Sequence, residues 1–228
     1  MKELIIENLR KSYSDVPVFE GVNLHYRSGL LNGIIGKNGA GKSTFFNCIA
    51  RIIAYEGNIA RKNIESIGTL SANQYIFPRI TGYEFVRFCL SAKKRPENKQ
   101  RLLQLNELFE LPLKKYAENY STGMLKKLHL LALLLQENDL LMLDEPFNGL
   151  DIQSAAYLSE ILKEMKHTNS LIFISSHDIS HLLKIVDTLT VIENGSVYLK
   201  TESLSDIEKT YQKEAEERVK SVFIKQID

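Results

Sequence analysis

The chain has 228 residues, of which 44% are hydrophobic and 25% are charged. At about 150 residues per domain, this length fits one large domain or one domain with a small inserted lobe, and the composition excludes a disordered, collagen-like or disulfide-stapled chain. The formal net charge of +1 gives no bulk attraction for nucleic acid or anionic lipid. The two cysteines, Cys48 and Cys89, have no CxxC spacing and are typical of buried thiols in a reducing compartment.

No stretch of the sequence comes near the roughly 18–20 apolar residues that a bilayer span needs. The longest apolar run, Leu128–Leu135, is short and contains His129. The N-terminal segment has scattered charges and no apolar signal-peptide core. We therefore expect a cytoplasmic protein, to which another chain must supply membrane segments if it works at a membrane.

Short apolar runs separated by turn signals begin the chain. Ile5–Ile6, Val16–Val18 and Val22–Leu24 predict strands of a small antiparallel sheet. Leu30–Ile35 predicts a buried strand that ends in a glycine-rich turn, and Lys42–Ala54 predicts a helix.

Residues 55–70 return to short strands, in which Gly57 and Gly68 are expected to be breaks. Residues 78–138 differ, because their apolar residues recur at helical spacing, as in Leu102–Phe109. We interpret this stretch as a mostly helical lobe inserted between two strands of one core.

The last third of the chain returns to strand-like runs. Leu140–Leu143 and Leu171–Ile174 are typical of strands buried on both faces of a parallel sheet. Asn194-Gly195 predicts a tight hairpin. A helix over about residues 203–224 has an apolar stripe, which we expect to pack on its own domain. The stripe consists of Leu204, Ile207, Tyr211, Ala215, Val219 and Val222.

Gly36–Ser43, here called the phosphate loop, reads GKNGAGKS and fits G-x-x-x-x-G-K-[ST] between a strand and a helix. Its glycines let backbone N–H groups turn toward polyphosphate oxygens, and the helix N-terminus adds positive charge. Lys42 can reach the β and γ phosphates, and Ser43 can ligate Mg²⁺. The strand and helix around the loop argue against an incidental glycine-rich turn. The predicted nucleotide-binding residues are Gly36, Lys37, Asn38, Gly39, Ala40, Gly41, Lys42, Ser43 and Thr44.

Leu140–Glu145 is an apolar run that ends in two acids. Asp144 can hold Mg²⁺, as in P-loop ATPases, and Glu145 can polarise a water in line with the γ-phosphate. Two acids after a strand can also belong to a helix N-cap region. The phosphate loop about 100 residues upstream favours the catalytic interpretation.

With these motifs in order, residues 3–200 resemble the ATP-binding subunit of an ABC transporter. The resemblance implies an α/β fold: a P-loop NTPase (RecA-like) core with an N-terminal antiparallel β-subdomain and an inserted helical subdomain. We expect residues 1–228 to form one such domain, with the helical subdomain at about 78–138. Tyr13 stands where the family keeps an aromatic that stacks on adenine.

Tyr120–Met124, with the sequence YSTGM, resembles the family signature L-S-G-G-Q, from which Thr122 and Met124 depart. Taken alone, Ser121 is the N-cap of the following helix, whose free N–H groups form an anion site. The resemblance implies that Ser121 and Gly123 bind the ATP held by the other subunit.

Asn148–Asp151, with the sequence NGLD, resembles the loop that crosses the dimer interface and links the two ATP sites. His177 matches the family's switch histidine, which contacts the γ-phosphate and orients Glu145 and the water. A lone histidine after a strand is often structural, but the SSHD sequence around it favours a catalytic role.

One residue of the family pattern is missing. The family usually has a glutamine six residues before a proline, where it ligates Mg²⁺ and senses the membrane partner. Counting back from Pro78, that position is Ala72. Gln74 substitutes if the loop shifts in register, and otherwise a water fills the position. The departure bears on hydrolysis and coupling more than on nucleotide binding.

The resemblance implies an ATPase, with ATP and Mg²⁺ as cofactors, that energises transport through a separate membrane permease. A homodimer, or a heterodimer with a similar subunit, would close head to tail around two ATP molecules. The chain would then lie at the inner face of the cell membrane, docked through the helical lobe and the loop 72–78. The spelling STGM with NGLD resembles subunits of separate-chain exporters, and the cargo and direction stay open.

Two alternatives remain from the sequence. A soluble regulatory or nucleic-acid-associated ABC ATPase usually has two such domains or long insertions, and this chain has neither these nor a basic stripe, so no nucleic acid partner is expected. A nucleotide switch with weak hydrolysis is favoured by Ala72 and opposed by Glu145 and His177. A GTPase is disfavoured because no N-K-x-D motif is present.

Overall fold

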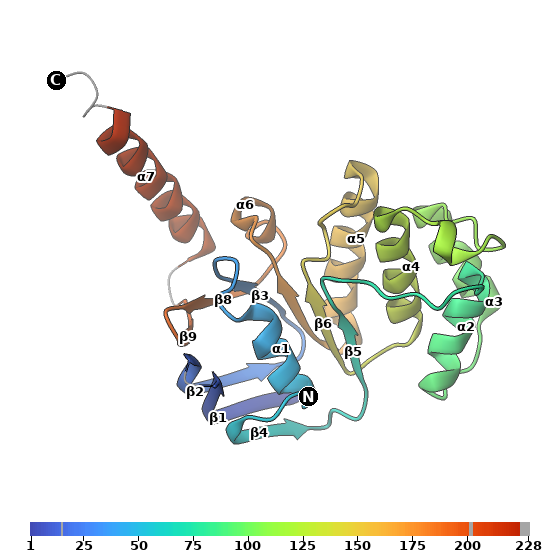
Figure 1. Cartoon of the computed structure of the whole chain (residues 1–228), viewed down its shortest axis with the longest axis horizontal. Helices are drawn as coiled ribbons and strands as arrows, with labels where there is room; N and C mark the ends of the chain where they lie inside the picture. Colours follow the sequence, from blue (N-terminus) through green and yellow to red (C-terminus); the bar gives the residue numbers. More distant parts are fainter. Residues whose placement is uncertain (15, 201–202, 224–228) are drawn as a thin grey trace.

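The computed structural model describes residues 1–14, 16–200 and 203–223, which form two sheets and a set of helices (Figure 1). The strands are β1 (Glu3–Tyr13), β2 (Val16–Arg27), β3 (Leu31–Ile35), β4 (Glu56–Lys62), β5 (Ile67–Leu70), β6 (Leu140–Asp144), β7 (Leu171–Ser175), β8 (Thr188–Glu193) and β9 (Ser196–Leu199). The helices are α1 (Lys42–Ala50), α2 (Gly82–Ala92), α3 (Lys99–Phe109), η1 (Ala117–Asn119), α4 (Thr122–Leu135), α5 (Ile152–Met165), η2 (Lys166–Thr168), α6 (Ile179–Leu182) and α7 (Leu204–Phe223).

The larger sheet has the strand order β5-β6-β7-β3-β8-β9, and every pair except β8–β9 is parallel. All residues of β3, β6 and β7 are buried. Alternate residues of these strands face two different cores, since Leu140 and Met142 pack with α1 while Leu141 and Leu143 pack with α4 and α5. Helices therefore cover both faces of the sheet, which explains why its strands read as continuous apolar runs.

The smaller sheet is antiparallel, with the order β2-β1-β4. It contains the strands predicted near the N-terminus, but β2 is one continuous strand and not two pieces. The register between β1 and β2 shifts between Ile6 and Leu9, where Asn8 has a φ of 50°. A β-bulge of this kind lets a strand continue through residues that do not alternate strictly.

The predictions that Gly57 and Gly68 break strands are wrong, because Gly57 lies inside β4 and Gly68 inside β5. Both glycines allow another part of the chain to approach closely. A Cβ at Gly57 would lie 2.3 Å from the Asn8 carbonyl oxygen, and a Cβ at Gly68 would lie 2.5 Å from the Asn138 side chain. A glycine within a strand thus marks a close contact here rather than an end.

Gly57→Ala is expected to destabilise the protein by about 2–4 kcal/mol, because overpacking against backbone adds to an unfavourable φ. The matched control is Gly29→Ala. Gly29 has nearly the same φ, 92° against 93°, but a Cβ there meets nothing within 4 Å. Urea denaturation should show a loss of only about 1–2 kcal/mol for the control, and equal losses would contradict the close-contact explanation.

Helix α1 ends at Ala50, four residues before the predicted end at Ala54. Arg51 has a left-handed backbone, and its N–H donates to the carbonyls of Asn47 and Cys48. Because this C-cap is an arginine and not the usual glycine, the sequence carried no stop signal. Cys48 is buried and Cys89 half-buried, both as free thiols. Burial raises the pKa of each to about 11.

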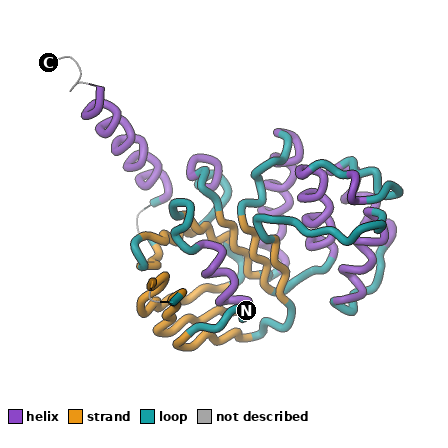
Figure 2. The backbone as a smooth tube through the Cα atoms, viewed as in Figure 1, coloured by secondary structure: helices purple, strands orange, loops and turns teal. Residues whose placement is uncertain are grey.

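Between β5 and β6, the chain forms α2, α3, η1 and α4, which gather at one end of the molecule (Figure 2). Helix α2 begins with a capping box, in which Thr81 and Glu84 each accept from the other's backbone N–H. Asn194-Gly195 forms the predicted hairpin turn between β8 and β9, with φ values of 48° and 79°. No helix in the described ranges is long and apolar enough to cross a bilayer.

Helix α7 leaves the body of the molecule instead of packing along its whole length (Figure 1). Ile207 is 3% exposed and Leu204 and Tyr211 pack against the core, whereas Val219 is 55% exposed. The first turns of the helix pack on the domain as expected, but the expectation is wrong for Val219, farther along the stripe. The side chains of Ala215 and Val222 lie outside the described residues.

Candidate functional site

The carboxyl ends of β3, β6 and β7 meet at one edge of the larger sheet. In the parallel register, both Ile34 and Asp144 lie beside Ser175. The phosphate loop follows β3, Glu145 follows β6 and His177 follows β7. Parallel strand ends of α/β sheets are where ligands usually bind, and the topology places these predicted site residues together there.

The geometry of the phosphate loop depends on its glycines. A Cβ at Gly36 would lie 2.7 Å from the Ile192 carbonyl oxygen. Gly41 has a φ of 109° and is the N-cap of α1 without any side-chain cap. The first N–H groups of α1 are therefore not capped by a side chain at this position and can face an anion. Lys42 is 7% exposed, and its ammonium donates to the Gly36 carbonyl at 2.8 Å.

Asp144 is 4% exposed and accepts two hydroxyl hydrogen bonds. Ser43 donates to one of its carboxylate oxygens and Ser175 donates to the other. A hydroxyl and a carboxylate side by side are hard oxygen donors of the kind that Mg²⁺ takes alongside phosphate oxygens and water. The predicted ligands Ser43 and Asp144 are thus adjacent and fit that ion.

The side chain of Gln74 does not take the place predicted for a metal ligand. Its side-chain amide donates to the carbonyls of Ser71, at 2.7 Å, and Ala72, at 3.3 Å. The described contacts of Gln74 are therefore with its own loop, and the structure does not bring it to Ser43 or Asp144. The register shift that would make Gln74 a substitute ligand is not seen.

Glu145 has the left-handed φ of 50°, which is uncommon for a residue with a side chain. From this backbone its carboxylate, 13% exposed, accepts from His177 Nδ1 at 2.9 Å and lies 3.7 Å from Lys42 Nζ. His177 is 54% exposed. The predicted catalytic pair, Glu145 and His177, is in contact, with the lysine of the phosphate loop beside it.

A cavity of about 640 Å³ opens beside the phosphate loop. It is lined by residues of β2 and the β8–β9 turn, by His177 and by Tyr211 of α7. Tyr13, the predicted adenine-stacking residue, is 50% exposed and pairs with Val16 at the cavity edge. The Lys11 ammonium lies 4.7 Å from the centre of the Tyr13 ring.

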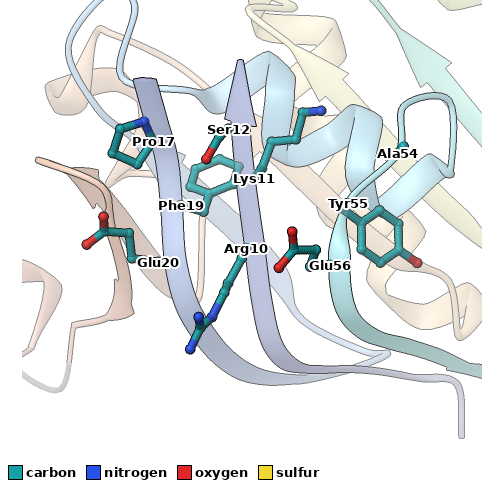
Figure 3. Close-up of a pocket in the computed structure, with 9 residues that line it drawn as sticks. All are labelled: Arg10, Lys11, Ser12, Pro17, Phe19, Glu20, Ala54, Tyr55 and Glu56. Carbon is teal, nitrogen blue, oxygen red and sulfur yellow. The ribbon is translucent and has the colours of Figure 1, made fainter. Parts of the chain in front are cut away.

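A second hollow, of about 670 Å³, lies between β1, β2 and the start of β4 (Figure 3). Basic and acidic side chains alternate around it, so its charge favours no single ligand type. Its lining is Arg10, Lys11, Ser12, Pro17, Phe19, Glu20, Ala54, Tyr55 and Glu56. It includes no residue of the phosphate loop, whereas the first cavity adjoins the predicted nucleotide-binding residues Gly36–Ala40.

The signature-like segment begins α4, as predicted. Ser121 is the N-cap and accepts from the Met124 N–H at 3.2 Å. A Cβ at Gly123 would lie 2.5 Å from the Gly149 carbonyl oxygen, so Gly123 lets α4 touch the loop Asn148–Asp151. Asp151 pairs with Lys127 at 2.5 Å, and the hydrogen bond from Lys127, together with one from the Ser154 N–H, lowers the pKa of Asp151.

One residue of the site was missed from the sequence. Lys126, on α4, is 6% exposed and donates to the carbonyls of Glu145 and Asn148. The sequence did contain a signal for this residue. Lys126 lies just before the apolar run Leu128–Leu135 in the same helix, and a lysine that is buried beside such a run almost always has a partner. Periodicity alone could not name those partners.

A family model described as ABC transporter matches residues 19–148 of the chain. The chain belongs to the ABC transporter family. This ABC ATPase is 30% identical over 226 residues to the bacitracin transport ATP-binding protein BcrA of Enterococcus faecalis, covering 92% of this chain and 72% of that protein. It is also 30% identical over 211 residues to the probable sulfate/thiosulfate import ATP-binding protein CysA of Chlorella vulgaris. That match covers 85% of this chain and 89% of that protein.

The solved structure of cbiO1 from Clostridium perfringens, described as part of the ABC transporter complex cbiONQ, superposes with a TM-score of 0.72. The two chains are 27% identical, and the match covers 95% of this chain and 94% of that one. The α/β P-loop NTPase fold and the function of a transporter's ATP-binding subunit, both expected from the sequence, are confirmed.

Proposed function

We propose that this ABC ATPase hydrolyses Mg·ATP in a head-to-tail dimer and thereby drives a separate membrane permease at the inner face of the cell membrane. The observation that carries the proposal is the meeting of Lys42, Asp144 and Glu145 at one sheet edge. These groups are the parts that phosphoryl transfer to water needs: a phosphate clamp, a metal ligand and a base.

Ser43 and Asp144 are the proposed ligands of Mg²⁺. When bound, the ion neutralises charge on the phosphate oxygens. Lys42 and the N–H groups that begin α1 hold the same oxygens from the protein side. The Ser43–Asp144 hydrogen bond uses only the hydroxyl proton and leaves the lone pairs of the Ser43 oxygen free, so the contact seen here is a preformed arrangement of residues that would hold the ion.

Glu145 is the proposed base that orients the attacking water and accepts its proton. The His177 Nδ1 contact at 2.9 Å fixes the direction of the carboxylate. Because His177 is half-exposed and lines the cavity, its other ring nitrogen can meet the γ-phosphate when ATP is present. Tyr13 at the cavity edge is the proposed adenine contact.

The dimer is proposed from the position of the signature segment. Ser121 is exposed at the N-terminus of the 14-residue helix α4. A helix start of this kind can bind phosphate, and within the described part of the chain the Ser121 hydroxyl accepts from the Met124 N–H and is not bonded to the phosphate loop. A second copy, or a similar subunit, turned head to tail would bring Ser121 and Gly123 to its partner's ATP.

Three exposed aromatic rings form the proposed permease contact. Tyr75, Phe77 and Phe88 are 69%, 43% and 51% exposed. The Tyr75–Phe77 and Phe77–Phe88 rings pack edge to face, each pair with centroids 5.4 Å apart. A clustered, solvent-exposed aromatic surface is typical of protein interfaces. It joins the loop after β5 to α2, the region expected to dock the permease.

The test is ATP turnover of the purified chain as a function of Mg²⁺ and of protein concentration. Turnover per chain should rise with protein concentration, because each complete site needs two chains, and should fall to background when EDTA removes Mg²⁺. A Lys42→Met preparation measures contaminating ATPases. Turnover per chain that is constant over a hundredfold dilution down to nanomolar chain would contradict the dimer, and turnover without Mg²⁺ would contradict the metal site.

A further inference from the structure

Lys126 is a buried cation beside the turn that carries Glu145. It lies one turn inside α4 and is 6% exposed. Its ammonium donates to the Glu145 carbonyl at 2.9 Å and to the Asn148 carbonyl at 2.7 Å. Burial lowers the pKa of Lys126, while the carboxylates of Glu145 and Asp144 raise it. A buried ammonium is tolerated only with strong partners, and here the partners are backbone atoms.

Those two carbonyls stand at the two ends of one tight turn. The Asn148 N–H donates to the Glu145 carbonyl at 3.3 Å, which closes the turn. The same Glu145 carbonyl accepts from Lys126, so a single cation bridges the start and the end of the turn. An apolar residue at position 126 would leave both carbonyls facing a buried space without this donor.

The turn carries an unfavourable backbone at Glu145. Its φ of 50° brings Cβ close to the carbonyl oxygen, so the conformation must be held from outside. On one side, the Glu145 N–H donates to the backbone and hydroxyl oxygens of Ser175, at 3.2 and 3.1 Å. On the other side, the bond from Lys126 holds the carbonyl. Between these two anchors, the carboxylate faces His177 and Lys42.

We propose that Lys126 is a positioning residue for hydrolysis: its ammonium clamps the carbonyls of Glu145 and Asn148 and thereby holds the Glu145 carboxylate against His177, in line with the γ-phosphate. The inference rests on the proposed function, because it needs Glu145 to be the base. It also joins α4, which begins with Ser121, to the turn that carries the base, so the two move as one unit.

Lys126→Met is expected to lower kcat by about 10–100-fold, because a small misplacement of a catalytic group has effects of that size. The Kd for ATP should change by less than about 3-fold, because the phosphate loop does not contact Lys126. Lys126→Arg keeps a cation with two donors and should lie between the parent and Lys126→Met. Lys126→Gln, shorter and neutral, should lie near Lys126→Met.

The decisive measurement is a double-mutant cycle with Glu145→Gln. If Lys126 acts through the Glu145 carboxylate, Lys126→Met should change the residual turnover of Glu145→Gln by less than about 2-fold. A merely structural lysine would lower turnover by the same factor in both backgrounds. The matched control is Lys2→Met, since Lys2 is largely buried in an ion pair with Asp139, 2.9 Å away. It should lower Tm and leave kcat unchanged.

The outcomes separate the two levels of the proposal. Equal factors in both backgrounds, or a kcat equal to that of the parent for Lys126→Met, would overturn the role of Lys126. Parental turnover in Glu145→Gln alone would instead overturn the proposed function. If Lys126→Met does not fold, the other two variants provide the test. At constant Kd for ATP, kcat should fall from the parent to Lys126→Arg and further to Lys126→Gln, and equal kcat values in all three would overturn the inference.

Discussion

Glu145→Gln is expected to lower ATP turnover by about 10²–10⁴-fold, the usual contribution of a positioned base. The amide keeps the size of the carboxylate and can still accept from His177 Nδ1, so the turn and the cavity should be retained. It cannot take the proton of the attacking water. Turnover of Mg·ATP at saturating nucleotide measures the loss, and the Kd for ATP should stay within about 3-fold of the parent.

The same variant should accumulate an ATP-bound dimer. The γ-phosphate contacts across the interface exist only while ATP is intact, so a chain that binds but does not hydrolyse ATP stays closed. Size-exclusion chromatography with Mg·ATP should show the dimer, and with ADP the monomer.

Glu160→Gln is the matched control, because Glu160 is exposed on α5 and pairs with Lys163 one turn away. It should keep parental turnover and show no stabilised dimer. If Glu145→Gln keeps more than half of the parental turnover, another group activates the water. If it loses turnover but stays monomeric with Mg·ATP, the head-to-tail arrangement is wrong while the base is right.

The local motifs of the site could be predicted from the sequence because the backbone geometry of each motif requires particular residue types at particular positions. The glycines of the phosphate loop are required by a carbonyl 2.7 Å from a Cβ position at Gly36 and by a φ of 109° at Gly41. The apolar runs before Asp144 and His177 predict parallel strands, and parallel strands bring their carboxyl ends together. Motif order and sheet topology were therefore enough to place Lys42, Asp144 and Glu145 side by side.

The contacts that were missed join residues distant in sequence through tertiary packing. Lys126 and Glu145 are 19 residues apart, and no periodicity specifies that an ammonium on one helix meets a carbonyl in another loop. The contact of Gly123 with Gly149 is of the same kind. Arg51 shows the other failure, since a left-handed C-cap without glycine leaves no trace in the sequence. The sequence therefore predicts the motifs themselves but not the tertiary contacts that connect one motif to another.

Lys42→Met is expected to weaken ATP binding by about 10–100-fold and to abolish turnover. The ammonium is nearly buried and faces the loop through the Gly36 carbonyl, and methionine keeps its length without the charge. Losing hydrogen bonds from a charged donor to phosphate has an effect of that size. Titration calorimetry with Mg·ATP measures the loss. Lys163→Met, which removes an exposed lysine on α5, is the control and should bind ATP like the parent.

Ser121→Asp should also abolish turnover, but by disturbing the ATP that is bound to the partner chain. Aspartate is as good an N-cap as serine, so α4 should fold. Its negative charge, however, would oppose the γ-phosphate that the partner chain presents. Ser121→Asn keeps the cap without the charge and should retain most of the turnover. The Kd of Ser121→Asp for ATP should stay close to that of the parent, because each chain's phosphate loop is intact.

Mixing the two inactive variants then distinguishes a shared site from a site within one chain. In a head-to-tail dimer, Lys42→Met supplies an intact signature segment, and Ser121→Asp supplies an intact phosphate loop. An equal mixture forms mixed dimers half of the time, each with one complete site, so about a quarter of the parental turnover should return. A chain whose Ser121 serves its own ATP cannot be rescued in this way. No recovery, with both variants folded and the parent dimeric, would therefore place the signature in the same site as its own phosphate loop and overturn the head-to-tail dimer.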